Sequence, residues 1–325
     1  MPAVSVILVF HRDIRHLRPA IASILNQTLR DLELLLVDNG CGLPAESLGP
    51  LAADPRVRWV RLARDDGIGV AANAGVAAAR GEFVAIADYD DLSRPNRLER
   101  QLAALRADPG LDLVSALADR IDGDDRPISG RCFTLAQPEG FRAYAQYAAP
   151  VIHPVAMGRR ALFQALPFRP PFRFTSELDF YARAVECARL GVLPEVLLDY
   201  RWYPAQTTQH YHANIEQARA MINLLTARRR AGRPEHLAEL AAMADGLTPA
   251  EFCRRVAACC LVEGYPVPAA YLARRSLALQ RTPAAAVAAA GLAVRAWRAA
   301  PPAERSLTRR MFLTGPVRAL GLVPA

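Results

Sequence analysis

The first 122 residues alternate between continuous apolar runs and segments whose apolar residues recur at helical spacing. Uninterrupted apolar runs rich in β-branched residues and Leu are typical of strands buried on both faces of a parallel sheet. Strands are predicted at 4–10, 32–38, 82–88 and 111–122, with an alternating, half-exposed strand at 56–63. Helices are predicted at 17–28, 69–80 and 96–108. This order predicts an α/β fold with a mostly parallel sheet flanked by helices.

The strand ends carry the first candidate functional residues. Ligands of such open sheets bind beyond the carboxyl ends of the strands. Asp38 and Asp88 each stand at a predicted strand end of this kind. Because the carboxyl ends of parallel strands share one edge of the sheet, the topology predicts that both acids line one crevice.

The pattern weakens beyond residue 123 and then changes character. A Pro-rich loop is predicted at 165–174, an amphipathic helix at 176–191 and a strand at 195–203. From residue 205 the chain is rich in Ala and Arg and is predicted to be helical. The predicted organisation is therefore an α/β domain at 1–204 and an α-helical region at 205–325.

Within the helical region, residues 251–283 read as two helices joined at the sequence EGYPVP. Such a pair resembles one unit of the helical-hairpin repeats of the tetratricopeptide type. A helical bundle explains the same pattern, and we favour it because only one clear unit is present.

Charge is distributed unevenly along the 325 residues. Residues 1–204 hold 24 Arg against 25 acidic residues, whereas residues 205–325 hold 16 Arg against 7, and Lys is absent. The balanced first part argues against a nucleic-acid-binding groove. The basic second part indicates either contact with anionic lipid headgroups or another polyanion, or a solvated Arg-rich helical surface.

The cysteines and the apolar runs indicate a cytoplasmic protein. None of the six Cys has the C-x2-C spacing of a zinc site or redox motif, so free thiols in a reducing compartment are expected. The apolar run at 4–10 is too short for a signal peptide, and the run at 283–294 is too short to span a bilayer.

Three carboxylates follow the predicted strand at 82–88 within four residues, namely Asp88, Asp90 and Asp91. Ionised carboxylates at close range repel one another, and burying one without a partner is costly. Carboxylate oxygens are ligands for Mg²⁺ or Mn²⁺, which take one or two of them together with phosphate oxygens. One acid could instead cap the following helix, with Asp91 or Ser93 as the candidate, but three acids exceed what a cap needs.

Several stretches in sequence order resemble the family 2 glycosyltransferases. They are SVILVFHR, SILNQTLRDLELLLVDNG, DGIGVAANAGVAAARGEFVAIADYDDLSRPNRLERQ and a later YR, which together cover 3–204. The resemblance implies the GT-A fold, a nucleotide-binding half at 1–122 and an acceptor half at 123–204. It also implies an inverting enzyme that uses a nucleotide-sugar donor and a divalent metal ion.

The resemblance assigns the nucleotide pocket to residues at the strand ends. Asp38 takes the place of the Asp that binds the donor base. Val9, Phe10, Gly67 and Asn73 fall in stretches that line the nucleotide. This chain departs from the family pattern at Asn39, Cys41, Asp65 and Ala72, and the missing Arg at Ala72 removes a phosphate partner. For Asn73, close packing of small residues between helix and sheet is the alternative.

The metal and the diphosphate are assigned to a second group of residues. The resemblance places Asp88 near the ribose and the metal, and Asp90 as the main metal ligand. Arg201 could pair with the diphosphate through two hydrogen bonds. His210 lies where related enzymes bring a loop over the donor phosphates, and it is a further candidate metal ligand.

The general base is assigned to the start of the helix at 176–191. Alignment on Arg183 puts Glu177 at the position of the family's catalytic Asp and Asp179 at the second Asp of that motif. Glu177 retains the carboxylate but lengthens the arm by one methylene. The alternative is that both acids stabilise the positive end of the helix. His153 matches a region near the acceptor, although a His beside a Pro is more often structural.

These assignments predict transfer of a sugar from a UDP-, GDP- or dTDP-sugar to a hydroxyl of a glycan or lipid-linked acceptor, in polysaccharide or glycoconjugate biosynthesis. Two alternatives differ in class. A phosphatase of the haloacid dehalogenase type would use Asp88 as a nucleophile, but that class opens its domain with the motif. A non-catalytic nucleotide-sugar-binding module is suggested by Asn39, Ala72 and Glu177. The basic region at 205–325 suggests peripheral contact with the inner face of a membrane.

Overall fold

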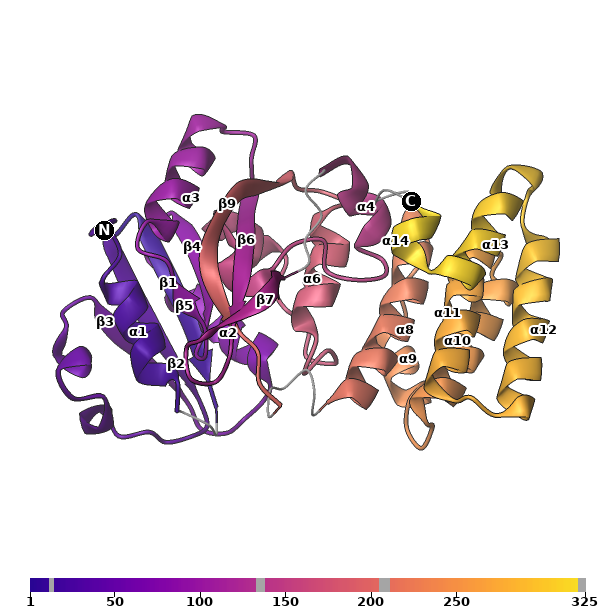
Figure 1. Cartoon of the computed structure of the whole chain (residues 1–325), viewed down its shortest axis with the longest axis horizontal. Helices are drawn as coiled ribbons and strands as arrows, with labels where there is room; N and C mark the ends of the chain where they lie inside the picture. Colours follow the sequence, from indigo (N-terminus) through magenta and orange to yellow (C-terminus); the bar gives the residue numbers. More distant parts are fainter. Residues whose placement is uncertain (12–14, 133–137, 205–210, 321–325) are drawn as a thin grey trace. The chain divides into compact units, whose positions relative to one another are not determined.

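The computed structural model describes residues 1–11, 15–132, 138–204 and 211–320. The chain forms two compact units, drawn in Figure 1. Unit 1 comprises Met1–Phe141 and Ala149–Thr207, and unit 2 comprises Arg142–Ala148 and Thr208–Ala325. The domain boundary predicted after residue 204 borders the segment 205–210, which lies outside the described residues.

The first four long strands of unit 1 form a parallel sheet. They are β1 (Val4–Phe10), β2 (Leu32–Asn39), β3 (Val57–Leu62) and β4 (Phe83–Asp88), in the spatial order β3-β2-β1-β4. β3 lies at the edge, as its alternating pattern predicts. Phe10 is in register with Asp38, and Val9 is in register with Asp88. The ends of β2 and β4 therefore lie on the two sides of the end of β1, which is the crevice expected from the sequence.

The other half of the sheet mixes strand directions. The short strand β8 (Met157–Arg159) runs antiparallel between β4 and β6 (Leu113–Ile121). Strand β6 is parallel to β9 (Leu190–Arg201), and β5 (Leu92–Ser93) pairs antiparallel with β9. The strand β7 (Pro127–Arg131) forms a hairpin with β6 and pairs antiparallel with its end. The predicted α/β sheet is confirmed, but antiparallel strands make it mixed.

Helices flank this sheet (Figure 1). Those predicted at 17–28, 69–80 and 96–108 appear as α1 (Leu17–Leu25), α2 (Ile68–Ala78) and α3 (Arg97–Ala107). Helix α2 is built from small residues because it packs tightly on the sheet: a Cβ at Gly75 would lie 2.6 Å from Cγ2 of Ile7. The remaining helical segments of unit 1 are η1 (Ala45–Ala53), η2 (Pro138–Gly140), η3 (His153–Val155), α5 (Arg160–Ala165) and α6 (Ser176–Ala184), and all of α4 (Phe141–Tyr144) except its first residue belongs to unit 2.

Two predicted element boundaries are wrong. Helix α6 ends at Ala184 rather than residue 191, and β9 begins at Leu190 rather than residue 195. The strand therefore includes Pro194, which lacks an N–H for the ladder. The register of β9 against β6 shifts between Ala116 and Leu117, and a bulge of this kind accommodates a proline inside a strand.

The proposed capping role of Asp91 or Ser93 is also wrong. The residue that precedes α3 is Asn96, whose side chain makes no capping hydrogen bond, and the first-turn N–H of Leu98 donates instead to Oε1 of Gln27 at 3.0 Å. Asp91 instead accepts a hydrogen bond from the backbone N–H of Arg201 at 2.8 Å, and Ser93 accepts one from the Arg97 guanidinium. The acidic segment is thus held by β9 and by the side chain of Arg97.

Unit 2 is helical. Its main helices are α8 (His212–Arg230), α9 (Leu237–Met243), α10 (Pro249–Val262), α11 (Pro266–Leu279), α12 (Pro283–Ala299), η4 (Pro302–Glu304), α13 (Arg305–Thr314) and α14 (Pro316–Ala319). Helix α10 packs on α8 and α11, and α11 packs on α12 and α13. The two helices predicted within 251–283 are confirmed, with their joint at 263–265. No described helix combines the length and the apolar content needed to cross a bilayer.

The segment Arg142–Ala148 belongs to unit 2 because its side chains bind α8. Gln146 donates to the backbone carbonyl of Asn223 at 3.1 Å and accepts from Arg230 at 3.1 Å. The interior of the unit also holds Glu216, whose buried carboxylate pairs with Arg219 and Arg275. A buried charge is tolerated when it is paired in this way.

Candidate active site

The end of β4 carries a cluster of carboxylates with too little positive charge around it. Asp90 and Asp91 are only 9% and 3% exposed. Burial raises the pKa of Asp88 to about 7, and the charges of Asp90 and Glu177 add to the effect. Burial and the charges of Asp90 and Asp88 also raise the pKa of Asp91 well above its usual range. Within the described residues, Oδ2 of Asp91 is buried without a hydrogen-bond partner.

Arg97 is a residue beside this cluster that the sequence analysis missed. Its guanidinium is fully buried and donates to the carbonyl of Ile86 at 2.6 Å and to Oγ of Ser93 at 2.9 Å. Burial lowers the pKa of Arg97 to about 10, and its charge lowers the pKa of Asp88. A signal was available, because helical spacing puts Arg97 on the same face as Leu98, Leu102 and Leu105. An arginine on a buried face requires a partner.

Arg201 holds the acidic segment from inside the protein. Its Nε donates to the carbonyl of Asp90 at 2.6 Å, and its Nη1 donates to the carbonyl of Asp122 at 2.8 Å. Its Nη2 lies 2.6 Å from Oδ1 of Asp125. The side chain is fully buried. The diphosphate contact predicted for Arg201 stays a prediction, and these contacts favour a positioning role.

Tyr203 is a second residue that the sequence analysis missed. Its hydroxyl donates to Oδ2 of Asp90 at 3.0 Å. The ring packs against the ring of His16, with centroids 5.6 Å apart. Burial and the charge of Asp90 raise the pKa of Tyr203, which keeps the phenol protonated as a donor. Tyr203 therefore orients the carboxylate that the resemblance names as the main metal ligand.

Glu177 lies in the first turn of α6 and is half-buried. Its negative charge contributes to the raised pKa of Asp88 and to that of Tyr181. A charge shifts the pKa of another group in this way only when the two groups are near each other. The fold therefore brings the predicted general base and the predicted metal-binding acids together, although 89 positions separate Glu177 from Asp88 in the sequence.

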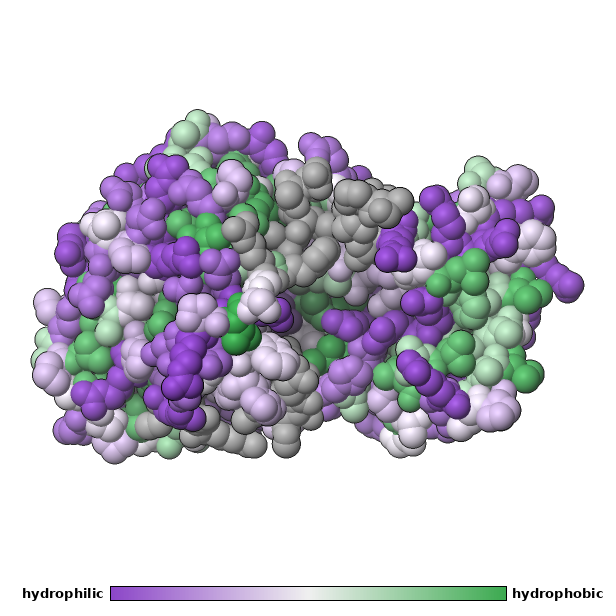
Figure 2. All heavy atoms as spheres, viewed as in Figure 1, coloured by the Kyte–Doolittle hydropathy of each residue, from purple (hydrophilic) through white to green (hydrophobic). Residues whose placement is uncertain are grey.

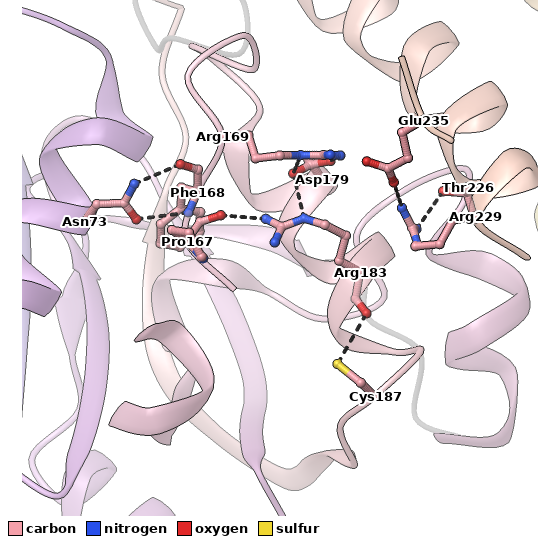
Figure 3. Close-up of polar contacts among 10 residues, drawn as sticks. All are labelled: Asn73, Pro167, Phe168, Arg169, Asp179, Arg183, Cys187, Thr226, Arg229 and Glu235. Carbon is pink, nitrogen blue, oxygen red and sulfur yellow. Dashed lines mark hydrogen bonds and ion pairs between the residues drawn. The ribbon is translucent and has the colours of Figure 1, made fainter. Parts of the chain in front are cut away.

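Asp179 is engaged by two arginines, as Figure 3 shows. Its buried carboxylate accepts from Nε of Arg169 at 2.8 Å and from Nε of Arg183 at 3.0 Å, and Nη2 of Arg169 also donates to it. Arg183 in turn donates to the carbonyl of Pro167 at 2.8 Å. The network ties α6 to the 165–174 loop. It favours a structural role for Asp179 over the predicted catalytic one, which stays a prediction.

Asn73 ties the same loop to α2 (Figure 3). Its Nδ2 donates to the carbonyl of Phe168 at 2.8 Å, and its Oδ1 accepts from the N–H of Phe168 at 2.9 Å. Both polar atoms of the amide are thus used on the protein backbone. The predicted nucleotide contact of Asn73 is untested, and the observed pair positions the Pro-rich loop beside the site.

Asp38 organises the loop that follows β2. Its carboxylate accepts from the N–H groups of Cys41 at 2.7 Å and Leu43 at 2.9 Å, and from Arg61 at 3.3 Å. Contact of Asp38 with a donor base stays a prediction. Phe10 is buried beside it with its ring edge-on to Trp59, and Val9 is half-buried.

Gly67 immediately precedes α2, and its backbone lies close to the side chain of Arg173. Its φ is +98°, and a Cβ there would lie 2.8 Å from Cγ of Arg173. Its N–H donates to Asp65, which also accepts from Asn39 and pairs with Arg173. Although burial acts to raise it, the pKa of Asp65 is lowered by the Gly67 hydrogen bond and the charge of Arg173. The departures Asn39 and Asp65 therefore form one hydrogen-bonded unit.

The two candidate histidines have different outcomes. Nδ1 of His153 lies 3.0 Å from the hydroxyl of Tyr181, and its ring contacts that of Phe168. Burial lowers the pKa of His153 to about 4, so this ring is neutral near pH 7, as suits a packed position. The predicted metal ligand His210 lies outside the described residues.

The carboxylates fit a hard divalent cation, although they do not form a complete protein cage. Among the described residues, no three His, Cys, Asp or Glu side chains are arranged to hold a metal ion. Mg²⁺ and Mn²⁺ sites at diphosphates need only one or two carboxylates, with phosphate oxygens and water supplying the rest. The raised pKa of Asp88 and the orphaned oxygen of Asp91 show a local excess of negative charge that a cation would relieve.

Comparison with known proteins now decides the family. Residues 5–166 match the model of glycosyl transferase family 2. The chain belongs to this family. It is 27% identical over 210 residues to an uncharacterized glycosyltransferase of Methanocaldococcus jannaschii, covering 62% of this chain and 71% of that protein. It is 37% identical over 138 residues to the succinoglycan biosynthesis protein ExoO of Rhizobium meliloti, covering 42% of this chain and 38% of that protein.

Solved structures confirm the fold of this family 2 member. Residues 1–349 of TarS from S. aureus, crystallised in complex with UDP, superpose with a TM-score of 0.61 at 14% identity, covering 99% of this chain and 90% of that one. The same residues of TarS in complex with UDP-GlcNAc give the same TM-score at 15% identity. The fold is the GT-A glycosyltransferase fold with a C-terminal helical region, as the sequence predicts.

Proposed function

We propose that this glycosyltransferase is an inverting, metal-assisted enzyme that moves a sugar from a nucleotide-sugar to a hydroxyl of a glycan or lipid-linked acceptor. The observation that carries the proposal is the shared electrostatic environment of Asp88, Asp90 and Glu177 at the end of β4. Two roles are needed for such a transfer, a support for the leaving diphosphate and a base for the acceptor hydroxyl. The site offers carboxylates for both.

Asp88 and Asp90 would hold Mg²⁺ or Mn²⁺, which as a Lewis acid supplies charge stabilisation to a leaving diphosphate. The chain's own contribution is to fix these carboxylates before the donor arrives. Tyr203 orients Oδ2 of Asp90, and Arg201 holds the backbone of the same residue. The cluster remains net negative, because two buried guanidiniums, those of Arg97 and Arg201, act on its carboxylates and Arg201 also pairs with Asp125.

Glu177 is the proposed general base. In an inverting transfer the base takes the proton of the acceptor hydroxyl while the oxygen attacks the anomeric carbon and the nucleoside diphosphate departs from the opposite side. The base must lie within hydrogen-bond reach of that hydroxyl. Glu177 lies in the first turn of α6, half-buried and near Asp88, and this position supports the role of general base.

The donor is proposed to be a UDP-sugar, because the superposed TarS structures are complexes with UDP and UDP-GlcNAc. GDP- and dTDP-sugars are the alternatives to be tested. Relatives named for succinoglycan biosynthesis and as a chondroitin synthase support an acceptor from polysaccharide biosynthesis. A cytoplasmic location, where nucleotide-sugars are made, fits the free thiols of the described cysteines.

A thermal-shift screen tests the proposal directly. The protein would be heated with UDP, GDP, dTDP and their sugars, each with and without Mn²⁺, because a bound ligand stabilises by mass action. We expect one nucleotide family to raise the melting temperature only when Mn²⁺ is present. Asp90→Asn should abolish the metal-dependent part of the shift while the unliganded variant melts no lower than the unsubstituted protein.

Turnover of the donor separates the enzyme from a non-catalytic module. Slow metal-dependent hydrolysis of the stabilising nucleotide-sugar would support catalysis, since water can replace the acceptor. Metal-dependent binding without hydrolysis or transfer to any acceptor would identify a nucleotide-sugar-binding module of the same fold. An unchanged metal-dependent shift in Asp90→Asn would refute the metal site.

A further inference from the structure

The last helices of unit 2 carry an unbalanced positive charge. Residues 281–320 contain seven arginines and a single acidic residue, Glu304. All seven arginine side chains are exposed, namely Arg281, Arg295, Arg298, Arg305, Arg309, Arg310 and Arg318. The dense positive charge here is therefore a property of the surface.

These arginines have no acidic partner among the side chains that the structure describes. Within the described residues, no carboxylate lies within 4 Å of any of the seven, whereas Arg228 and Arg229 of the same unit pair with Glu263 and Glu235. Arg305 stacks over the ring of Trp297 at 5.6 Å and donates to the carbonyl of Ala300. Its charge remains uncompensated. An anion from outside the chain would find no competing carboxylate.

Apolar side chains are exposed among the same helices. Val287 is 74% exposed, Val294 48%, Trp297 44% and Leu313 54%. Val287 and Val294 are seven residues apart and so share a face of α12. Figure 2 shows apolar residues, in green, beside hydrophilic ones, in purple, over the part of unit 2 that holds these helices. Exposed apolar side chains that share a helix face give a surface that a partner could cover.

A groove adjoins this surface. Its cavity of about 620 Å³ is lined by the ends of α11, α12 and α13. Leu277, Pro283, Ala286 and Phe312 supply apolar walls, and Arg274 and Arg281 supply charge. Leu313 belongs both to the groove and to the exposed apolar residues. The groove and the exposed surface are therefore continuous at α13.

We propose that α12 and α13 form a docking surface for an anionic lipid bilayer. Anionic headgroups attract surface arginines, and aliphatic and Trp side chains insert at the boundary of headgroups and acyl chains. A nucleic acid would satisfy the arginines but would leave the exposed valines and Leu313 in water. A symmetric second copy would bring like charges face to face, because a two-fold interface uses the same patch on both subunits.

The test is flotation of the full chain with vesicles, in the absence of any sugar donor. Vesicles of phosphatidylcholine alone are compared with vesicles of phosphatidylcholine and phosphatidylglycerol, at rising salt. We expect binding only to the anionic vesicles, weakening as salt screens the attraction. Because no donor is present, the outcome is independent of the proposed catalytic function.

Two sets of substitutions locate the surface. Arg295→Gln, Arg309→Gln and Arg310→Gln together should weaken the partition to anionic vesicles on the order of 100-fold. Arg298 is left in place because it lies in the last turn of α12, where a cation stabilises the helix. The matched control is Arg18→Gln, Arg30→Gln and Arg80→Gln, three exposed arginines of unit 1 for which the described residues supply no acidic partner. This control should bind as the unsubstituted chain does.

The double substitution Trp297→Ser with Leu313→Ser tests the apolar contribution to vesicle binding. Its effect should be largest at high salt, where the attraction between charges is screened. Circular dichroism melts show whether each variant remains folded, and a folded variant is required for each comparison. Equal loss in both arginine triples would overturn the proposal, since nonspecific charge would then explain the binding. Sedimentation in the absence of lipid gives a second way to overturn the proposal. If the chain sediments as a dimer and the double substitution Trp297→Ser with Leu313→Ser dissociates that dimer, a second copy of the chain occupies the surface.

Discussion

Unit 1 and the last helices of unit 2 leave charges of opposite sign uncompensated. Fourteen described arginines of unit 1 lie within 4 Å of a carboxylate. Yet Asp88 forms no ion pair among the described residues, and one oxygen of Asp91 has no partner. Residues 281–320 show the reverse, with exposed arginines that have no acidic partner within the part of the chain that the structure describes.

This difference in uncompensated charge indicates which part of the chain would bind a cation and which part would bind an anionic partner. Paired arginines such as Arg201 and Arg169 fix loops, and their charge is consumed within the fold. Uncompensated carboxylates at the end of β4 suit a cation, whereas uncompensated arginines beside exposed apolar side chains suit an anionic surface. Charge that the fold does not neutralise is expensive unless a ligand or water does so. Substitutions that remove one kind of charge or the other should therefore have different consequences.

The largest effect is expected from Glu177→Gln. The substitution keeps the shape of the side chain but removes its ability to accept a proton, so transfer should fall about 10²- to 10⁴-fold. Stability and donor binding should persist, because Gln keeps the size and the hydrogen-bonding shape of the Glu177 side chain. Steady-state transfer and a thermal shift with donor measure both. Glu177→Asp is the matched control and should keep part of the rate; full activity in Glu177→Gln would exclude Glu177 as the base.

Arg201→Met tests a charge that is already paired within the fold. It leaves the carbonyls of Asp90 and Asp122 without their donors, and loss of a buried, paired charge costs about 3–5 kcal/mol of unfolding free energy. Arg18→Gln, at an exposed position, should stay within about 0.5 kcal/mol. Urea unfolding compares the two. A stable Arg201→Met variant with lost donor binding would show that the guanidinium serves the diphosphate, and the distinction between fixed and functional charge would fail at this residue.

Tyr203→Phe should have a smaller effect, confined to the metal. It removes only the hydroxyl that orients Asp90, and loss of such an orienting hydrogen bond weakens metal binding about 10-fold or more. Titration of Mn²⁺ by calorimetry or electron paramagnetic resonance measures the affinity without turnover. Tyr200→Phe is the matched control, since Tyr200 precedes Arg201 on the same strand and makes no described hydrogen bond to Asp90. Equal affinities in the two variants would assign Tyr203 to packing alone.

The smallest effect concerns pH. Because the pKa of Asp88 is raised to about 7 in the folded protein, its contribution to stability is present at low pH and lost as pH rises through about 7. Without metal, the melting temperature should therefore fall by a few degrees between about pH 4 and pH 7. Asp88→Asn should flatten this part of the profile, and Mn²⁺ should reverse the loss at the upper end. An unchanged slope in Asp88→Asn would assign the pH dependence to other groups.

Much of the fold could be predicted because parallel strands buried on both faces leave a plain apolar signature. The runs at 4–10, 32–38 and 82–88 became β1, β2 and β4 with boundaries shifted by one residue at most. β8 was missed because three residues between two neighbours carry no periodicity of their own. The ends of α6 and β9 were misplaced because a bulge, which depends on the partner strand, accommodates Pro194.

The sequence by itself determined the α/β pattern, the acids at the strand ends and the basic character of the last helices, since each depends on residues close together in the chain. Only the tertiary structure decided which charged side chains are paired within the fold. Arg201 and Tyr203 reach Asp90 from 111 and 113 residues away, and Asn73 reaches Phe168 from 95. Whether a charged side chain meets a partner within the fold depends on such distant contacts. Local sequence shows that a charge is present, whereas the folded chain determines whether it remains available to a ligand.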